Sequence, residues 1–342
     1  MFRRKKMGIL PCALGVVLLL SGCGRGGNAE DTDVKYPKMK ILLSTTVSEQ
    51  SNATVAGKLF AEKIADRTNG NIEVAVYSSD QLSGGNMSKG VEMLTQGAID
   101  CAFEPVDVLA VLDKKLLALS LPWTFDSYEQ AEACLNSTGG EFIREKLRAK
   151  DIETLGFIHN GFRQLTNSKR SVTTPDDIKN MKLRVPGGDV FMEFFKSLGA
   201  DPVSMSFSEL FTALQQGTVD GQENGFDLIT STKFYEVQKY ITSWNYSYGA
   251  FAMAFSSKTW ESLNDDTRKL FRETAAEICK IGCENVVNNE ESQRQEIMDY
   301  GCELTDLTQE QIQVFKEQLT GYYVKMKAQY GEEACKAFGI ED

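Results

Sequence analysis

Apolar positions in the first part of the chain recur with two different periods. Residues 40–45, 72–77 and 99–103 are short apolar or alternating runs, a pattern that is typical of strands. Residues 54–67 and 86–95 carry apolar side chains three and four positions apart, which predicts helices. Because the strand and helix signals alternate, the pattern predicts a βαβαβ unit with a parallel sheet and helices on its faces.

The same alternation continues through residues 161–226. Thr174 is expected to begin a short helix, because a proline takes the first turn and two acids then face the positive end of the helix dipole. A strand is predicted at residues 182–185 and a helix at residues 190–198. Ser208 is expected to cap the helix after that.

Later segments favour a second domain. Residues 129–147 predict one or two helices, and residues 251–255 predict a strand that returns to the first domain. Residues 266–287 have an amphipathic pattern that could continue as one long helix across both domains. About 320 residues follow the first 22, a length that suits two domains with sizeable cores.

The first 22 residues have the pattern of a secretion signal. Basic residues at positions 3–6 precede an apolar run at residues 9–20, which is too short for a standard membrane-spanning helix. Leu-Ser-Gly-Cys at residues 20–23 is similar to a bacterial lipobox, which implies cleavage before Cys23 and lipid attachment there. An ordinary cysteine near a signal is the alternative. Residues 23–36 would then form a flexible tether, because they are rich in glycine and then acidic.

The charge of the chain limits its range of partners. The net charge is −11, and loss of the four basic signal residues would reduce 37 basic residues to 33 against 48 acids, near −15. Such a charge disfavours nucleic acid and anionic membrane surfaces as partners. Local arginines would have to hold any anionic ligand against this overall field.

Two arginines stand at unusual places in the hydrophobic pattern. Arg163 follows an apolar segment, and Arg184 lies inside the apolar run at residues 182–186, which ends in proline. Arginine is seldom buried without a partner, and its planar fork suits a carboxylate or phosphate. One interpretation is therefore an anionic ligand, and the alternative is a structural ion pair with a neighbouring acid.

Polar side chains also gather where predicted strands end. Residues 219–224 place several polar side chains beside a glycine, and the ends of strands are where α/β folds bind ligands. Ser44 stands at the end of the first strand, and Glu104 and Asp107 follow the third. Such residues serve as turn formers as often as they contact ligands.

The sequence lacks the motifs of common enzymes. It has no Gly-x-Ser-x-Gly elbow, no His-Glu-x-x-His and no phosphate-binding glycine loop. His159 is the only histidine and has no nearby nucleophile, although carboxylate pairs stay open as acid–base groups. Cys279 and Cys283 are one helical turn apart, but no second pair has metal-ligand spacing, so free thiols are favoured. We therefore expect no catalytic residue, metal or cofactor.

Several motifs together resemble one family, the substrate-binding proteins of tripartite ATP-independent periplasmic (TRAP) transporters. The motifs are Gly-x-Arg-x-x-Thr-Asn at residues 161–167, Leu-Arg-Val-Pro at 183–186 and Asp-Gly-Gln-Glu-Asn at 220–224. Residues 206–215 match the helix that connects the last two in this family, and 233–240 follow at the expected distance. The resemblance extends more loosely from about residue 40 to the C-terminus.

The resemblance implies an α/β fold of two domains that close as a periplasmic-binding-protein-like clamp. Each domain would be a mixed sheet flanked by helices, with hinge strands and a long helix bridging the two. Domain I would comprise residues 37–160 and about 250–285, and domain II residues 161–249 and about 286–342. Contacts of the ligand with both walls of the cleft would favour the closed state.

The family pattern also assigns roles within the site. The arginine of Leu-Arg-Val-Pro pairs with the ligand carboxylate, which implies this role for Arg184. Arg163 would support the same carboxylate or a neighbouring polar group, Asn224 would hydrogen-bond the same end of the ligand, and Phe207 would pack on its face. Trp123, in an apolar loop similar to one at the edge of the family's cleft, is either a ligand contact or part of the core. The remaining candidates for ligand contacts are Ser44, Glu104 and Tyr248.

Departures from the family pattern concern the ligand. Gly225 stands where the family has proline after the asparagine, which is expected to loosen the backbone beside Asn224. Pro105 and Val108 stand where the sialic-acid branch has a glutamate and an arginine, which argues against sialic acid. Sugar acids such as hexuronates and four-carbon dicarboxylates stay open.

The resemblance thus implies an exported, lipid-anchored protein, expected to be a monomer, that delivers a small organic acid to the membrane subunits of a TRAP transporter. It would sit on the outer face of the cytoplasmic membrane or in the periplasm. A binding protein of an ATP-driven importer or sensor kinase is one alternative. An exported carbohydrate-acting enzyme is the other.

Overall fold

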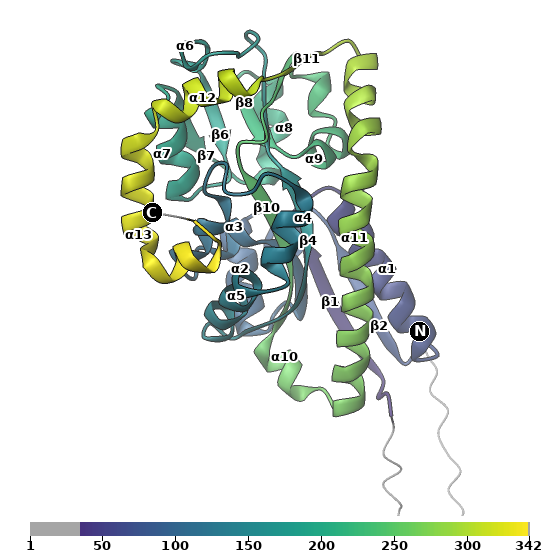
Figure 1. The fold of residues 1–342 in the computed structure, drawn as a ribbon. Coiled ribbons are helices and arrows are strands. Elements are labelled where there is room, and N and C mark those ends of the chain that lie inside the picture. Colours follow the sequence, from purple (N-terminus) through teal and green to yellow (C-terminus); the bar gives the residue numbers. More distant parts are fainter. Residues whose placement is uncertain (1–34, 341–342) are drawn as a thin grey trace, which may run out of the picture. The chain divides into compact units, whose positions relative to one another are not determined.

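Two mixed sheets form the framework of residues 35–340, the part of the chain that the computed structural model describes (Figure 1). The predicted signal segment, the lipidation site at Cys23 and most of the predicted tether lie outside these residues. We call the first sheet with its helices lobe I and the second sheet with its helices lobe II. The predicted two-part α/β architecture is confirmed, while the division into domains by residue range stays a prediction.

The sheet of lobe I has the strand order β2-β1-β3-β10-β4. The first three strands are parallel, as the alternating pattern predicted, and β10 runs antiparallel to both β3 and β4. Strand β10 therefore returns to this lobe from far along the chain, as expected. The strands are β1 (Met39–Thr45), β2 (Ile72–Tyr77), β3 (Cys101–Pro105), β4 (Ile152–Phe162) and β10 (Tyr248–Ser256).

The sheet of lobe II has the strand order β11-β9-β5-β8-β6-β7. Strands β6 and β8 are parallel and β5 is antiparallel to β8. The C-terminal ends of β6 and β8 and the N-terminal end of β5 therefore lie on the same side of the sheet. The strands are β5 (Gln164–Asn167), β6 (Lys182–Val185), β7 (Asp201–Ser204), β8 (Gly221–Asn224), β9 (Tyr240–Ser243) and β11 (Glu303–Asp306).

Helices follow the strands in most of the predicted places. The segments of lobe I contain α1 (Asn52–Arg67), η1 (Gln81–Ser83), α2 (Met87–Gln96), α3 (Val106–Leu109), η2 (Lys114–Ser120), α4 (Tyr128–Leu135), α5 (Thr138–Arg148) and α10 (Ser257–Ser262). The segments of lobe II contain α6 (Pro175–Ile178), α7 (Asp189–Ser197), α8 (Phe207–Gln215), α9 (Phe226–Ser231), η3 (Phe234–Glu236) and α12 (Gln309–Glu317).

Two of the predicted helix starts have different outcomes. Thr174 and Asp177 form a capping box at the start of α6, as the sequence indicated. The prediction that Ser208 caps the next helix is wrong, because α8 begins earlier, at Phe207, and Ser206 is the cap. The Ser208 hydroxyl instead donates a hydrogen bond of 2.8 Å to the carbonyl oxygen of Gly85 in lobe I.

The chain crosses between the lobes at points that lie close together. It passes directly from β4 into β5 at Arg163 and returns ahead of β10, and the Arg163 amide donates to the Ser247 carbonyl across 2.8 Å. Helix α11 (Asp265–Asp299), 35 residues long, packs against α1 and β4 in lobe I and α9 and β11 in lobe II (Figure 1). The crossing strands and this helix occupy the positions of the predicted hinge.

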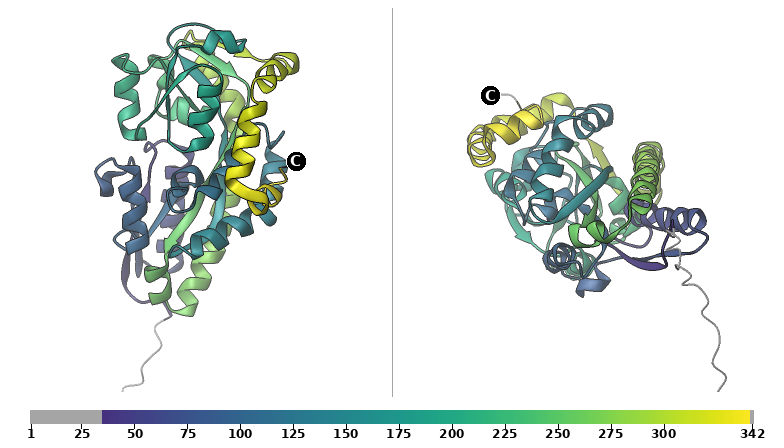
Figure 2. Two further views of the ribbon diagram at one scale, coloured as in Figure 1. Left: turned by 90° about the vertical axis from the view of Figure 1, so that its left-hand side faces the viewer. Right: turned by 90° about the horizontal axis from the view of Figure 1, so that it is seen from below.

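The C-terminal helix α13 (Thr320–Ala337) contacts both lobes on a different side from α11 (Figure 2). The Tyr322 hydroxyl donates to the Val190 carbonyl of lobe II, and the Tyr323 hydroxyl donates to the Pro122 carbonyl of lobe I. The segment 286–342, predicted to belong to the second domain, therefore packs against both.

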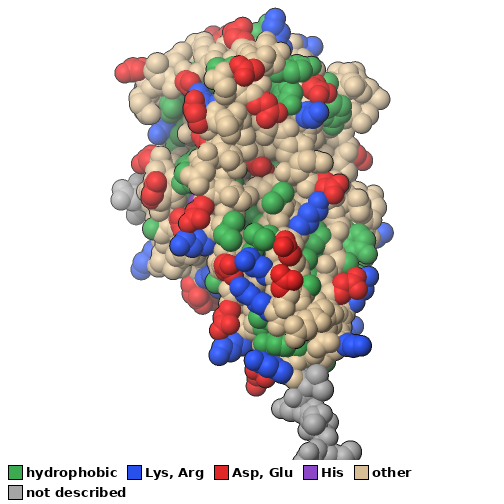
Figure 3. Space-filling view, turned by 90° about the vertical axis from the view of Figure 1, so that its right-hand side faces the viewer, with side chains coloured by type: hydrophobic (Ala, Val, Ile, Leu, Met, Phe, Trp, Pro, Cys, Tyr) green, Lys and Arg blue, Asp and Glu red, His purple; other side chains and the backbone are tan. Residues whose placement is uncertain are grey.

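Charged side chains are spread over the face that carries α11. Acidic and basic groups are interspersed there, and neither sign forms a continuous patch on that face (Figure 3). Within residues 35–340, no helix is both long and apolar enough to cross a membrane.

Gly225 allows β4 to approach the start of α9. Its φ of −67° lies in the range that proline requires, so the torsion angle alone would admit the family's proline. A Cβ atom at this position, however, would lie 2.6 Å from the Asn160 carbonyl oxygen. The glycine therefore serves close packing beside Asn224.

We predict that Gly225→Ala destabilises the protein by about 1–3 kcal/mol, because β4 or α9 must shift to admit the methyl group. Gly321→Ala is the matched control, since Gly321 is an exposed helical residue and a Cβ atom there would meet nothing within 4 Å. It should be neutral or stabilising by up to about 1 kcal/mol. Urea denaturation of both variants measures this, and equal stability of the two would contradict the proposed packing role.

Candidate functional site

A small cavity of about 20 Å³ lies between the lobes, next to the crossing strands. Both lobes contribute to its wall, and the lobe II side carries two arginines and an asparagine. The lining residues are Thr46, Val47, Met87, Pro105, Asp107, Val108 and Asn160 from lobe I, and Arg163, Arg184, Pro186, Phe207, Asn224 and Leu228. The structure thus brings Arg163, Arg184, Asn224 and Phe207 together, although they come from different strands and helices.

Arg163 is neutralised within the protein. Its guanidinium donates through Nε and Nη2 to the carboxylate of Glu223 on β8, and Nη1 lies 3.7 Å from Asp107 Oδ2. All three side chains are at most 5% exposed. Burial alone would lower the pKa of Arg163, but the Glu223 carboxylate outweighs burial and raises it. Tyr246 donates a further hydrogen bond of 2.7 Å to Glu223. For Arg163, the structural ion pair is therefore present.

Arg184 is buried without such a partner. Its Nε and Nη2 donate to the Met205 carbonyl oxygen, at 2.9 and 2.8 Å, and it forms no ion pair within residues 35–340. The side chain is 1% exposed, and burial lowers the pKa of the guanidinium to about 10, which Glu223 only partly opposes. Burying a cation without a counter-ion costs free energy, so the charge of Arg184 favours the binding of an anion at the cavity wall.

Phe207 and Asn224 complete the lobe II side of the cavity. The Arg184 guanidinium carbon lies 5.9 Å from the centre of the Phe207 ring, so the ring covers one face of the fork. Asn224 Oδ1 accepts a hydrogen bond of 3.2 Å from Arg163, which places the amide beside that arginine in the cavity wall. Two guanidinium groups and an aromatic ring thus share one wall of the cavity, and a guanidinium suits a planar anion.

Glu104 lies behind the cavity wall. Its carboxylate accepts a hydrogen bond of 2.7 Å from the Thr46 hydroxyl, and Thr46 is the residue that lines the cavity. Glu104 is 3% exposed, and burial, followed by the charge of Asp80, raises its pKa well above the ordinary value. Burial also raises the pKa of Asp80, to about 6. Glu104 therefore supports Thr46 and does not itself face the cavity.

The structure places three of the candidate contacts outside the cavity lining. Ser44 is inside β1 with strands on both sides, because the strand continues beyond it. Trp123 packs edge-on against aromatic rings of lobe II and donates from its indole nitrogen to the Trp244 carbonyl. Tyr248 is 2% exposed, and its hydroxyl lies 2.6 Å from His159 Nδ1. Local packing uses these three side chains, and their role as ligand contacts stays a prediction.

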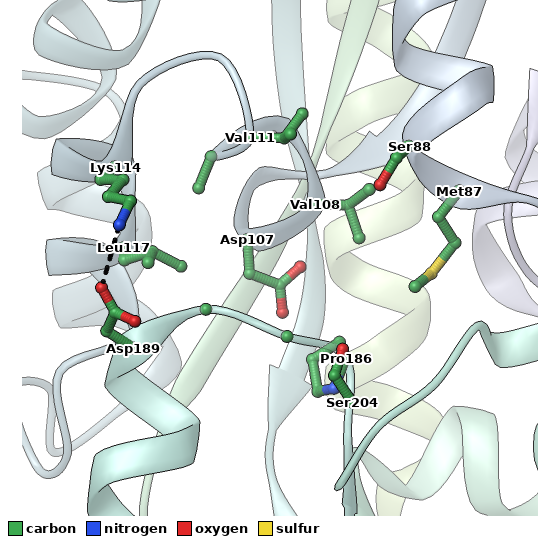
Figure 4. A pocket seen from close by; sticks show the side chains of 13 residues that line it. Met87, Ser88, Asp107, Val108, Val111, Lys114, Leu117, Pro186, Asp189 and Ser204 are labelled. Atoms are coloured by element: carbon green, nitrogen blue, oxygen red, sulfur yellow. Dashed lines mark hydrogen bonds and ion pairs between the residues drawn. The ribbon is translucent and has the colours of Figure 1, made fainter.

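A larger cavity of about 330 Å³ adjoins the first and shares Met87, Asp107, Val108 and Pro186 with it (Figure 4). In Figure 4 the Asp107 carboxylate projects between the lobes toward Pro186 and Ser204. At the rim, Lys114 of lobe I donates to Asp189 of lobe II across 3.3 Å. The two cavities give a path from the surface to the arginines, with Asp107 at their junction.

Sequence reasoning missed several residues of the site, among them Thr46 and Asn160. Asn160 lines the cavity from β4, and its Oδ1 atom is buried without a hydrogen-bond partner. Its only sequence signal is its place immediately before the Gly-x-Arg motif, at a strand end. Asp107 was noted for its position after the third strand, but its contact with Arg163 links segments that sequence does not relate.

The described residues offer little for catalysis or metal binding. No group of three or more histidine, cysteine or acidic side chains within residues 35–340 is arranged to hold a metal ion. Burial lowers the pKa of His159 to about 4, so its imidazole is neutral near pH 7. Burial raises the pKa of the Cys279 thiol well above its ordinary value and that of the Cys283 thiol to about 11, which leaves both unreactive. What the arrangement can do is bind an anion.

Comparisons with known proteins agree on one family. The model of "Bacterial extracellular solute-binding protein, family 7" matches residues 43–329. The C4-dicarboxylate-binding protein DctB of Bacillus subtilis is 28% identical over 308 residues, which cover 90% of this chain and 87% of the relative.

Solved structures show the same fold. The sugar acid binding protein DctPAm of Advenella mimigardefordensis, in complex with galactonate, has a TM-score of 0.86 at 28% identity, over 89% of this chain and 98% of that one. A TRAP periplasmic solute binding protein of Shewanella oneidensis, with bound succinate, has a TM-score of 0.84 at 27% identity, over 88% and 98%.

Because the two arginines have different surroundings, we predict that removing the partner of Arg163 and replacing Arg184 have different effects on the free energy of unfolding. Glu223→Gln should destabilise the ligand-free protein by about 3–5 kcal/mol, because Arg163 would then be a buried charge without its main partner. Arg184→Met keeps an apolar stem of similar length and removes an unpaired buried charge, so the free energy of unfolding should change by less than about 1 kcal/mol. Urea denaturation tests both. A comparable loss in the two variants would contradict the distinction.

Proposed function

The chain belongs to family 7 of the bacterial extracellular solute-binding proteins, and we propose that it captures a small carboxylate-bearing solute through Arg184 and delivers it to a TRAP-type transporter. The family and the structural neighbours are substrate-binding proteins and not enzymes, which agrees with the prediction that the chain is no enzyme.

The unpaired guanidinium of Arg184 is the observation that carries the proposal. Folding has buried a permanent positive charge against a backbone carbonyl, in a cavity that both lobes line. Such a site is favourable only when an anion completes it, and the planar fork matches the two oxygens of a carboxylate. Arg163 would hold the same end of the ligand through its position beside Asn224, while Glu223 keeps it neutral.

The two-lobed arrangement supports binding by closure. Direct contacts that join the lobes around the cavities include the hydrogen bond from Ser208 to Gly85 and the ion pair between Lys114 and Asp189. A ligand that touches both walls adds to these contacts only in the closed state, so it would shift the equilibrium by its differential binding energy. The membrane subunits would then recognise the closed form.

Sugar acids and dicarboxylates are the candidate ligand classes. The similar structures from Advenella and Shewanella were solved with galactonate and succinate, and the relative from Bacillus subtilis is named for four-carbon dicarboxylates. All of these carry the carboxylate that Arg184 would bind. We further propose that the protein acts as a monomer, with one ligand site per chain.

Lipid attachment at Cys23 is the proposed anchor, supported by the lipobox-like sequence at residues 20–23. We predict that Cys23→Ala, expressed in a bacterial host, yields a protein that no longer partitions into the detergent phase, because the acyl chains supply the apolar attachment. Phase partitioning of the native and variant proteins measures this. Continued partitioning of the variant would contradict lipidation at this cysteine.

We predict that Arg184→Lys weakens binding of the carboxylate ligand about ten- to a hundredfold. Lysine keeps the charge but loses the two-pronged geometry, and a hydrogen bond to a charged group contributes roughly 1.5–3 kcal/mol. Arg184→Ala should weaken binding further, because the carboxylate would be buried without a cation. Calorimetric titration with a panel of sugar acids and dicarboxylates gives the affinities.

Arg272→Lys and Arg272→Ala are the matched controls. Arg272 lies on α11, half exposed, stacks on Trp260 and pairs with Glu153 away from the cavity lining. Its variants should bind as tightly as the native protein. If the Arg184 variants also retain native affinity, Arg184 is not the carboxylate anchor and the proposed site is wrong.

A further inference from the structure

Two hydrogen-bond acceptors in the cavity lack donors. Asp107 Oδ1 and Asn160 Oδ1 are both buried and have no hydrogen-bond partner. The Asp107 side chain is 5% exposed, and Asn160 is 5% exposed. An unsatisfied buried acceptor costs free energy, and a carboxylate oxygen costs more than an amide oxygen. A ligand that fits this cavity therefore needs hydrogen-bond donors as well as a negative charge.

The position of Asp107 indicates where on the ligand a donor belongs. Its other oxygen, Oδ2, lies 3.7 Å from Arg163 Nη1, and the carboxylate lines both cavities. Arg184 lines the smaller of these cavities together with Asp107, so a ligand carboxylate held by Arg184 would bring its neighbouring atoms toward Asp107. Those neighbouring atoms must carry a hydroxyl or another N–H or O–H donor.

The charges of the site also limit the occupant. Both acids near the arginines, Asp107 and Glu223, pair with Arg163, so Arg184 has one positive charge that a single ligand carboxylate would neutralise. A second carboxylate would add a negative charge that no arginine of the site neutralises, facing Asp107 in a site of low dielectric constant. Lys114, at the rim, does little to offset this negative charge, because it is paired with Asp189.

Resting on the proposed carboxylate-binding function, we infer that Asp107 selects a hydroxylated monocarboxylate, such as a sugar acid, over an unsubstituted dicarboxylate. The ligand hydroxyl nearest to the carboxylate donates to Asp107 Oδ1, and a further hydroxyl donates to Asn160 Oδ1. An unsubstituted dicarboxylate at neutral pH has no donor for either acceptor. It also brings a second negative charge next to Asp107.

Calorimetric titration with two matched sets of ligands tests the inference. The four-carbon set is erythronate, butyrate and succinate, and the six-carbon set is gluconate, hexanoate and adipate. In at least one set, the hydroxylated acid should bind at least tenfold more tightly than both of the others. Asp107→Asn should weaken its binding about tenfold, because the charge-assisted hydrogen bond is lost, and should tighten binding of the dicarboxylate.

Asp176→Asn is the control, an exposed carboxylate that pairs with Lys179 outside the cavity lining; it should leave all affinities unchanged. Succinate or adipate binding as tightly as the hydroxylated acid, or unchanged selectivity in Asp107→Asn, overturns the role of Asp107. If that binding still depends on Arg184, the proposed function stands. If none of the six acids binds, both the selectivity and the carboxylate-binding function are overturned.

Discussion

The site depends on an imbalance between two buried arginines. Glu223 neutralises Arg163 through a two-pronged ion pair, so the strand crossing at Arg163 is stable in the empty protein. Arg184 has only a backbone carbonyl as its partner, so its charge is left for a ligand. If both arginines were paired, the cavity would have no strong demand for an anion. If neither were paired, two unneutralised buried charges would oppose folding.

The same residues join the site to the hinge. Arg163 lies between β4 and β5, its amide bonds to the returning strand at Ser247, and its side chain contacts acids of both lobes. A change in the relative position of the lobes must therefore alter the distance between Arg163 and Asp107. Because Gly225 has no side chain, β4 packs closely against the segment that carries Asn224. This part of the cavity wall therefore lies next to the strand crossing. If the lobes close on a ligand as proposed, these direct contacts would couple binding to closure.

Much of the fold and part of the site could be predicted from sequence. Periodicity located most strands and helices, and the family motifs identified Arg184 from the short run Leu-Arg-Val-Pro. Sequence could not tell which arginine is paired, because Glu223 is 60 residues from Arg163 and only the antiparallel pairing of β5 with β8 brings them together. Thr46 and Glu104 are likewise far apart in the sequence, so the sequence did not show that Thr46 faces the cavity and that Glu104 lies behind it.

A crystal structure of the protein with its tightest-binding organic acid tests most directly whether Arg184 binds the ligand carboxylate. We predict that this carboxylate lies on Arg184, with oxygen atoms about 3 Å from the guanidinium nitrogens and Phe207 against the ligand. Arg163 should keep its ion pair with Glu223. A carboxylate bound elsewhere, with Arg184 still bonded only to the Met205 carbonyl, would contradict the account.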